Sequence, residues 1–432
     1  MYRKAYHKLK EWKDSTARKP LLLLGARQVG KTWLMKEFGR NEYDNVVYIN
    51  CDAEPLAKNL FLQDYDIRRL LIAFQAISGE SIMERKTLII LDEIQEAPRG
   101  LHSLKYFCEN APGYHVMAAG SLLGITLSQK ESFPVGKVDM LKIYPMDFEE
   151  FLCAMNQRPL CEMLSERKYD WLDSFVGKLK DLLHQYYFVG GMPEIVKSFV
   201  DKGDLQEVRS LQEAIIEAYR NDISKHTSKT ESIRIGQVLS SLPSQLAKEN
   251  KKFIYGVAKK GGRAVEFELA IQWLVDAGLV YKVCRVNKVA VPLKFYEDIS
   301  AFKLFFLDVG LLCCMANVPP STILINADAL NEYKGMVAEE YVAQQLSSAG
   351  LLLYYWSNDK SSAELDFVVE LGGNVCPIEV KASTNVRGKS LTQFLKDNPG
   401  VKGVRYSMLN YKKQDWLTNY PLYSAPFSVK NA

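Results

Sequence analysis

A glycine-bounded loop directly after an apolar run is the feature that most constrains this chain. The run covers residues 20–24, and the loop is Gly25-Ala26-Arg27-Gln28-Val29-Gly30-Lys31-Thr32. The form G-x-x-x-x-G-K-[ST] lets backbone N–H groups surround a phosphate chain, while its lysine supplies charge and its hydroxyl can ligate Mg²⁺. Trp33 continues the loop into an amphipathic stretch that ends near Gly39, so a buried strand precedes it and a helix follows. The sequence therefore predicts a nucleoside triphosphate site built from residues 25–33.

Two carboxylates follow a later apolar strand. The run at residues 87–91 ends in Asp92 and Glu93. Ligands of open α/β sheets bind at the carboxyl ends of the strands, so we expect Asp92 and Thr32 to hold Mg²⁺. Glu93, one residue further, is then the base that orients or deprotonates the attacking water. The combination predicts a hydrolytic site that uses ATP and Mg²⁺.

Two parts of this site are left open by the sequence. Ser121 ends the run Ala118-Ala119-Gly120-Ser121, where its hydroxyl can bond the water or the γ-phosphate, or can cap a helix over residues 122–127. Hydrolysis also profits from an arginine finger. The candidates for the finger are Arg27, Arg99 and Lys137.

The order of apolar runs predicts the fold class. From residue 20 to about 145, strands at 21–24, 46–50, 88–91, 116–119 and 138–143 alternate with helical segments, which is typical of a mostly parallel sheet covered on both faces. Helical periodicity then dominates to about residue 230. We expect four domains: a P-loop domain over 1–155, a helical linker or lid over 156–230, a winged-helix-like module over 231–325, and a further α/β domain over 326–432.

Composition limits where the chain works and what it binds. The net charge of +4 is small for 432 residues, so any case for nucleic acid has to rest on a local cluster. No apolar stretch reaches the length of a membrane span, and Met1-Tyr2-Arg3-Lys4 lacks the apolar region of a signal peptide. The eight cysteines show no C-x-x-C spacing, which favours reduced thiols. We therefore expect a cytoplasmic protein with no membrane partner.

A second set of charged residues lies near the C-terminus. Asp366 ends a short run, and Glu379 and Lys381 follow on what reads as the next strand of a hairpin. Glu379 and Lys381 share one strand face because they are two residues apart. Asp366 and Glu379, with Glu339 as a further ligand, predict a Mg²⁺ or Mn²⁺ site in which Lys381 steadies the charge of phosphodiester cleavage. The alternative is a solvated strand face.

The first part of the chain resembles the AAA+-like ATPases of archaea and bacteria. The resemblance covers about residues 1–155 and rests on the loop, on Leu91-Asp92-Glu93-Ile94-Gln95, on Ala119-Gly120-Ser121 and on Tyr144-Pro145-Met146-Asp147-Phe148-Glu149-Glu150-Phe151. It implies ATP hydrolysis. Gly136-Lys137 stands where the family usually has Gly-Arg, and a lysine lacks the bidentate fork of arginine.

The rest of the chain, from about residue 185, resembles the domain of unknown function usually fused behind these ATPases. The matching segments are Phe188-Val189-Gly190-Gly191-Met192-Pro193, Phe306-Leu307-Asp308-Val309-Gly310-Leu311, Gly335-x-x-x-Glu339, Tyr355-Trp356, Glu364-Leu365-Asp366-Phe367 and Ile378-Glu379-Val380-Lys381-Ala382. That domain is similar to the PD-(D/E)xK nuclease fold, so the resemblance implies a restriction-nuclease-like α/β domain. Members of this fold can keep the scaffold for binding alone.

Ten basic residues cluster between positions 248 and 294. They favour phosphate contact with DNA or form a solvated face balanced by neighbouring glutamates. The cluster comprises Lys248, Lys251, Lys252, Lys259, Lys260, Arg263, Lys282, Arg285, Lys288 and Lys294. The leading hypothesis is an ATP-hydrolysing switch coupled to a nuclease-like, DNA-facing C-terminal domain. The alternative is an ATP-binding regulatory scaffold whose nuclease-like domain is inactive and binds a protein partner, with a homo-oligomer as a further candidate assembly.

Overall fold

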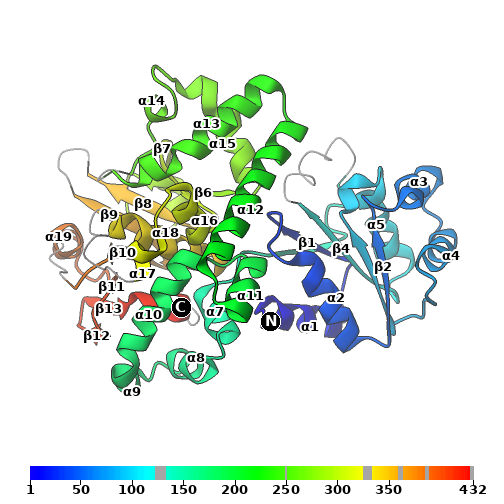
Figure 1. Cartoon of the computed structure of the whole chain (residues 1–432), viewed down its shortest axis with the longest axis horizontal. Coiled ribbons are helices and arrows are strands. Elements are labelled where there is room, and N and C mark those ends of the chain that lie inside the picture. Colours follow the sequence, from blue (N-terminus) through cyan, green and yellow to red (C-terminus); the bar gives the residue numbers. More distant parts are fainter. Residues whose placement is uncertain (122–132, 249–250, 325–332, 359–362, 385–388, 429–432) are drawn as a thin grey trace. The chain divides into compact units, whose positions relative to one another are not determined.

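The computed structural model describes residues 1–121, 133–248, 251–324, 333–358, 363–384 and 389–428 (Figure 1). The expected helix over residues 122–127 falls outside the described residues. The chain divides into two compact units. One consists of Met1–Tyr144 with Asp276–Gly278, and the other of Pro145–Val275 with Leu279–Ala432. Each unit is described by itself below.

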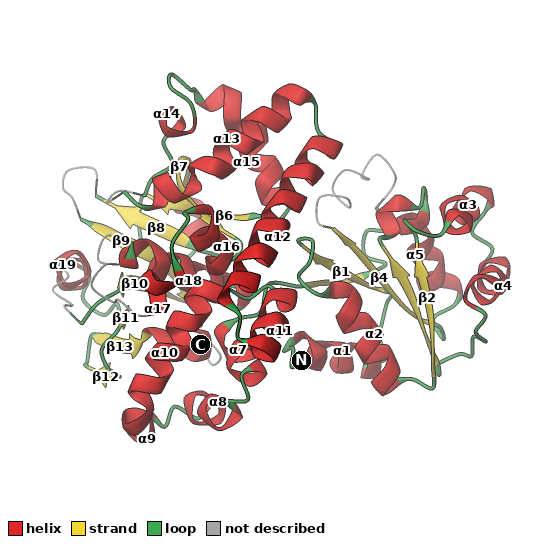
Figure 2. Ribbon diagram, viewed as in Figure 1, coloured by secondary structure: helices red, strands yellow, loops and turns green. Residues whose placement is uncertain are grey.

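Unit 1 contains a five-stranded parallel sheet in the order β2-β3-β4-β1-β5. All five strands expected in this region are present. The interior strands β3 and β4 are buried along their whole length, which is typical of a parallel sheet with both faces covered. Figure 2 shows the sheet strands and the helices of this unit. The strands are β1 (Leu21–Gly25), β2 (Asn45–Asn50), β3 (Thr87–Asp92), β4 (His115–Ser121) and β5 (Asp139–Lys142).

Helices cover this sheet and close its core. Phe61, Phe74 and Phe107, from three different helices, are fully or almost fully buried with Ile89 and Leu91 of β3 in one apolar cluster. Burial of aromatic side chains of this size contributes about 2–3 kcal/mol each. The helices are α1 (Ala5–Asp14), α2 (Lys31–Glu42), α3 (Pro55–Gln63), α4 (Ile67–Ser78) and α5 (Gly100–Asn110).

Unit 2 begins with helices, as the periodicity predicts. Capping boxes start two of them: Asp147 and Glu150 bond reciprocally at α7, and Ser228 and Glu231 do so at α13. Among the described residues, no helix is both long and apolar enough to cross a membrane. The helices before the first strand of this unit are α7 (Phe148–Ala154), α8 (Arg158–Ser165), α9 (Tyr169–Leu172), α10 (Val176–Val189), α11 (Pro193–Lys202), α12 (Leu205–His226), α13 (Lys229–Leu246), α14 (Tyr255–Ala258) and α15 (Ala264–Asp276).

A mixed eight-stranded sheet follows, in the order β12-β13-β11-β10-β9-β8-β6-β7. Further helices accompany it: α16 (Val309–Met315), α17 (Pro320–Leu324), α18 (Lys334–Ser348), α19 (Lys389–Asp397) and α20 (Ala425–Ser428). The strands are β6 (Val280–Val286), β7 (Glu297–Phe306), β8 (Tyr354–Ser357), β9 (Glu364–Leu371), β10 (Asn374–Lys381), β11 (Gly403–Ser407), β12 (Lys412–Lys413) and β13 (Leu417–Pro421).

The sheet joins regions that the sequence pattern separates. The antiparallel pair β6–β7, expected in a winged-helix-like module over 231–325, pairs through β6 with β8 of the region after residue 326. The expected boundary at 325/326 therefore falls within one sheet. Strand pairing between distant segments has no local signature, because backbone hydrogen bonds are independent of sequence separation.

The motifs at residues 188–193 and 306–311 meet in the core of unit 2, and their contacts explain why glycine and aspartate stand at these positions. The carboxylate of Asp308 caps α16 through the Leu311 N–H at 3.0 Å and accepts the Gly191 N–H at 2.6 Å. A Cβ on Gly310 would lie 2.5 Å from the backbone nitrogen of Gly190, so the two segments touch backbone to backbone. Burial raises the pKa of Asp308 to about 6. These motifs therefore stabilise the core of unit 2 by joining segments that are far apart in the sequence.

Candidate functional site

The loop after β1 has the backbone that a P-loop needs. A Cβ on Gly25 would come within 2.4 Å of the Ile143 carbonyl oxygen, so only glycine fits at the end of the strand. Gly30 adopts a left-handed conformation with φ of 88° directly before α2, and Gln28 has φ of 65°. The loop therefore curls at the N-terminus of a helix, where backbone N–H groups favour anions.

Lys31 lies inside this loop. Its side chain is buried, and its ammonium donates to the carbonyl oxygens of Gly25 at 3.0 Å and Ala26 at 2.9 Å. Burial lowers the pKa of Lys31 to about 8, although the nearby charges of Glu93 and Asp92 act in the opposite direction. The ammonium is thus held by neutral partners, at the place from which a P-loop lysine reaches phosphates.

Asp92 and Thr32, the residues predicted to hold Mg²⁺, contact each other beside the loop. The Thr32 hydroxyl donates to Asp92 Oδ2 at 2.7 Å, and the Tyr48 hydroxyl donates to the same oxygen at 3.0 Å. Strands β2 and β3 run in parallel register from Asn45 opposite Thr87 to Asn50 opposite Asp92, which brings Tyr48 to this edge. An adjacent hydroxyl and carboxylate are the oxygen ligands that Mg²⁺ takes beside triphosphates, so this donor set fits the metal.

Tyr48 was not among the residues predicted from the sequence. Its signal was available, because it stands two residues before the end of a strand next to β3, on a face that the strand alternation could have indicated. Burial raises the pKa of Tyr48, and the charge of Asp92 adds to the effect. The Lys36 ammonium lies 3.4 Å from the centre of its ring. The tyrosine therefore remains a neutral donor to Asp92.

Glu93 and Ser121 stand at the same edge of the sheet. Glu93 has a left-handed backbone with φ of 51°, and its carboxylate accepts a hydrogen bond from Gln95 Nε2 at 2.6 Å. A non-glycine residue in this conformation turns its side chain out of the strand direction. Ser121 is buried at the end of β4, directly opposite Gly25 in the parallel register with β1. Both predicted residues thus flank the loop.

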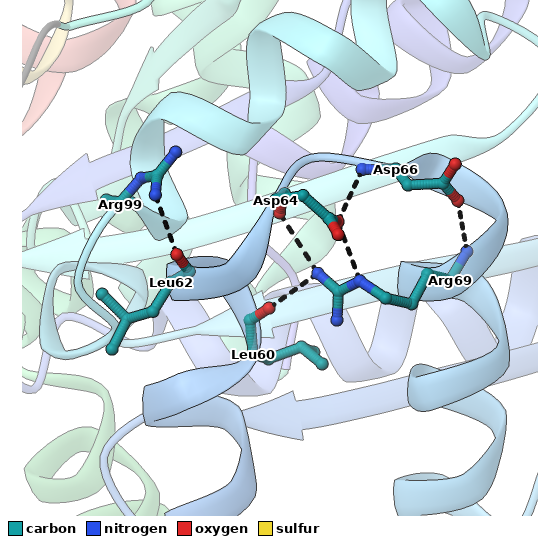
Figure 3. Close-up of polar contacts among 6 residues, drawn as sticks. All are labelled: Leu60, Leu62, Asp64, Asp66, Arg69 and Arg99. Atoms are coloured by element: carbon teal, nitrogen blue, oxygen red, sulfur yellow. Dashed lines mark hydrogen bonds and ion pairs between the residues drawn. The ribbon is translucent and has the colours of Figure 1, made fainter.

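The finger candidates differ in how they are held. Arg99 donates to the Leu62 carbonyl at 2.9 Å, near the end of α3 (Figure 3). It also donates to the Tyr65 hydroxyl at 2.9 Å. Lys137 forms an ion pair with Glu109 at 2.8 Å, and this contact raises the pKa of Lys137. Arg27 is in the loop itself. The geometry assigns structural partners to Arg99 and Lys137, and it does not identify the finger.

The second predicted site lies in unit 2 on the β9–β10 hairpin and α18. Strands β9 and β10 are antiparallel neighbours, as expected, and the Val380 N–H donates to Asp366 Oδ2 at 2.7 Å. Burial raises the pKa of Asp366 to about 7, and the charge of Glu339 on α18 adds to the effect. The predicted carboxylates Asp366 and Glu339 are therefore neighbours.

Basic side chains pair with the carboxylates of this site, and two of them, Lys251 and Arg405, were not predicted for it from the sequence. Lys251 contacts Glu339 Oε1 at 2.6 Å. Glu379 lies between Arg405 at 2.9 Å and Lys381 at 3.4 Å. These pairs neutralise the charges that a divalent cation would otherwise compensate.

A further lysine completes the cluster. Lys303 of β7 is fully buried and forms an ion pair with Glu364. Burial alone would lower the pKa of Lys303, but the charges of Glu364, Glu339 and Asp366 outweigh it and raise the pKa. Within the described ranges, no three side chains of His, Cys, Asp or Glu form a group that could hold a metal ion. The predicted donors Asp366, Glu379 and Glu339 therefore do not form such a group in the part of the chain that the structure describes.

Ion pairs also account for part of the basic cluster between positions 248 and 294. Lys259 pairs with Glu266 at 3.6 Å, and Arg285 pairs with Asp298 at 2.8 Å. Lys294 pairs with Glu297. Together with Lys251, at least four of the ten basic residues have carboxylate partners among the described residues, so the charge that this cluster offers to phosphates is smaller than the sequence suggests.

Family models match three parts of the chain. Residues 17–152 match an AAA domain, residues 180–322 match a domain of unknown function (DUF8612), and residues 334–424 match a second domain of unknown function (DUF4143). The first match coincides with the parallel sheet and the P-loop of unit 1. Unit 1 thus contains an AAA-type P-loop domain.

The chain is also weakly similar to several solved structures. The Walker-type ATPase PABY2304 of Pyrococcus abyssi is 13% identical with a TM-score of 0.44, and the match covers 72% of this chain and 94% of that one. The Aeropyrum pernix ORC1 protein in complex with DNA is 12% identical with a TM-score of 0.30, covering 75% and 95%. The Thermotoga maritima RuvB Holliday junction branch migration motor is 12% identical with a TM-score of 0.29, covering 68% and 91%. No curated protein matches the chain.

Proposed function

We propose that the AAA-type domain binds ATP with Mg²⁺ and hydrolyses it. The observation that carries this proposal is the contact of 2.7 Å between Thr32 and Asp92, beside a buried Lys31 whose ammonium donates to two carbonyl oxygens. A hydroxyl–carboxylate pair and a buried lysine at the carboxyl edge of a parallel sheet are what a Mg²⁺-bound triphosphate requires.

Each residue of the site has a role in this proposal. The backbone N–H groups of residues 25–32 bind the phosphates, and Lys31 supplies positive charge to the outer ones. Thr32 and Asp92 would hold Mg²⁺, which neutralises charge on the transferred phosphoryl group. Glu93 orients the attacking water and accepts its proton, while Ser121 offers a hydroxyl to the water or the γ-phosphate. Tyr48 fixes the Asp92 carboxylate through its 3.0 Å contact.

The test is a steady-state ATPase assay on the full chain. We expect Lys31→Ala and Glu93→Gln each to lower turnover by about 100-fold or more, because each removes charge stabilisation or water activation. Lys31→Ala should also abolish nucleotide binding, whereas Glu93→Gln should still bind. Arg40→Ala is a matched control, since this exposed residue lies on the same helix and outside the site. Full turnover in both site variants would refute the proposal.

A second proposal concerns the region behind the ATPase domain. We propose that it is a nuclease-like module that contacts DNA or a protein partner and reads out the nucleotide state. Asp366, Glu379 and Lys381 on one antiparallel hairpin beside a helix support the nuclease-like interpretation. The ion pairs of its carboxylates favour a binding role, that of a regulatory scaffold, over cleavage.

The proposed domain layout keeps an ATPase domain over 1–155 and a helical region over 156–230. The segments 231–325 and 326–432 then share one sheet.

All eight cysteines are free, which supports a reducing compartment such as the cytoplasm.

DNA contact is tested by measuring ATP turnover with and without single- and double-stranded DNA at moderate salt. Stimulation by either would support a DNA-facing module. An unchanged rate, no DNA affinity and a co-purifying protein would support the scaffold function instead.

A further inference from the structure

We propose that the carboxylate cluster of unit 2 is closed by the chain's own cations and binds no divalent metal. This inference rests on the proposed nuclease-like interpretation of the β9–β10 hairpin, and not on ATP hydrolysis. In this proposal Lys251, Lys303 and Arg405 neutralise the carboxylates in place of a metal ion. The module then does not cleave nucleic acid.

The first argument is the charge balance. The cluster contains four carboxylates and four basic groups, so its formal charges cancel when all are ionised. A nuclease metal site is instead anionic before the metal binds, because several carboxylates face one point. Adding a divalent cation to a neutral, largely buried cluster would leave its charge uncompensated, which is costly in a low-dielectric interior. The members are Glu339, Glu364, Asp366, Glu379, Lys251, Lys303, Lys381 and Arg405.

The second argument is how firmly the cations are placed. The Lys303 side chain is fully buried on β7, and the Lys251 side chain is only 12% exposed. Arg405 of β11 stands directly opposite Glu379 in the parallel register of β10 and β11. None of the three reaches its carboxylate from a solvent-exposed position. A metal ion would have to expel at least one buried cation before it could reach the carboxylates.

The third argument is the supply of free ligand atoms. Glu339 Oε2 is buried without a hydrogen-bond partner among the described residues, and it is the atom of the cluster most available to a cation. Asp366 Oδ2 and Glu379 Oε2 already accept hydrogen bonds. Mg²⁺ demands a nearly octahedral oxygen shell, in which these bonded oxygens would have to exchange or share their present donors.

The decisive measurement is a Mn²⁺ titration of the full chain followed by electron paramagnetic resonance, without nucleotide. Wild type and Asp366→Asn are compared, because the substitution removes a predicted ligand and keeps the side-chain shape. We expect superimposable titrations. A Mn²⁺ ion that the wild type binds and Asp366→Asn loses would overturn the inference.

A gain-of-binding variant tests the role of the lysines. Lys251→Met with Lys303→Met keeps the apolar stems and removes both charges, leaving the carboxylates in excess. We expect this double variant to bind a Mn²⁺ ion that the wild type does not bind. If it folds by circular dichroism and still binds none, the lysines are not what closes the site, and their assignment is wrong. If it does not fold, the comparison of wild type with Asp366→Asn decides.

A cleavage assay on the same samples separates this inference from the proposed function. Supercoiled plasmid is incubated with Mg²⁺ or Mn²⁺, and ATP turnover is measured in parallel. We expect no nicking above the level of Asp366→Ala with Lys381→Ala, whatever the ATPase result. Nicking by the wild type that this double variant lacks would overturn the inference and leave the ATPase proposal untouched. Loss of ATP turnover alone would refute only the ATPase proposal.

Discussion

Two buried lysines show how the two predicted sites differ. In unit 1, the ammonium of Lys31 faces two carbonyl oxygens, and burial lowers its pKa to about 8. In unit 2, Lys303 is at least as deeply buried, but the charges of Glu364, Glu339 and Asp366 raise its pKa. One lysine carries a charge that an anionic ligand can still compensate, whereas the other already has its counter-charges. The same residue types thus build a receptive site in one region and a closed one in the other.

The largest expected effect tests whether the closed cluster depends on Lys303. Lys303→Met leaves Glu364 and Asp366 in the interior without their cation. Breaking a buried ion pair from one side costs about 3–5 kcal/mol, so we expect the free energy of unfolding to fall by that amount. Urea denaturation of the full chain measures it.

Two further variants control for the cause of this loss. Lys294→Met removes the exposed partner of Glu297 and should cost less than about 1 kcal/mol. Adding Glu364→Gln to Lys303→Met removes the unpaired charge and should restore part of the stability. If Lys303→Met lowers the free energy of unfolding by less than about 1 kcal/mol, Lys303 does not neutralise the cluster, and it does not differ from Lys31 in the proposed way.

The next effect is the pH dependence of ATP binding, and it tests the open site. In the free protein Lys31 is charged below pH 8 and becomes neutral above it. Because the charged form binds phosphates, we expect the Kd for ATP to be flat below pH 8. Above it, the Kd should rise by up to about tenfold per pH unit. Calorimetry at several pH values, in buffers of different ionisation enthalpy, measures both the Kd and the accompanying proton uptake.

The lysine itself can be checked as the source of this dependence. Lys31→Met should bind weakly and without the break near pH 8. A Kd for wild type that stays constant to pH 9.5 would show that Lys31 keeps its ordinary pKa and does not differ from Lys303 in the proposed way.

The contact between the loop and Asp92 could be predicted from the sequence, whereas the ion pairs of the second cluster could not, and the reason is the distance along the chain. The loop residues 25–32 are contiguous, and Asp92 ends a strand whose apolar run marks it clearly. Parallel strands bring their carboxyl ends to one edge, so the meeting of Thr32 and Asp92 follows from the fold class. Local patterns therefore contained nearly all of the nucleotide site.

The cations of the second site have no such signature. Lys251 is 88 positions from Glu339, and Lys303 is 61 positions from Glu364. Both lysines come from segments whose local pattern indicates a surface cluster or an ordinary strand. The pairing of β6 with β8, which makes those segments part of one sheet, likewise depends on tertiary contacts. The carboxylates could be read from the sequence, but the side chains that neutralise them could not.

A smaller effect on ATP turnover is expected from the hydrogen bond that positions Asp92. Tyr48→Phe removes the hydroxyl that donates to Asp92 at 3.0 Å and leaves the ring in place. The loss of one hydrogen bond to a carboxylate is worth about 1 kcal/mol, so we expect ATP turnover to fall by about fivefold. Tyr6→Phe is the matched control, because it removes a hydroxyl that bonds Glu42 at 2.9 Å and should leave turnover unchanged. Equal rates for wild type and Tyr48→Phe would show that Asp92 is positioned without the tyrosine.

The smallest expected effect concerns Lys137, which shares a feature with the closed cluster although it lies in unit 1. Its ammonium already has a carboxylate partner, Glu109, at 2.8 Å. We therefore expect Lys137→Ala to change ATP turnover by less than about twofold, whereas loss of an arginine finger costs about 10³-fold or more. The assay should include Lys137→Arg, which would raise the rate if a bidentate group at this position completed the site. A drop of 100-fold or more in Lys137→Ala would mean that the ion pair with Glu109 opens during turnover. Pairing with a carboxylate would then no longer distinguish a structural lysine from a functional one.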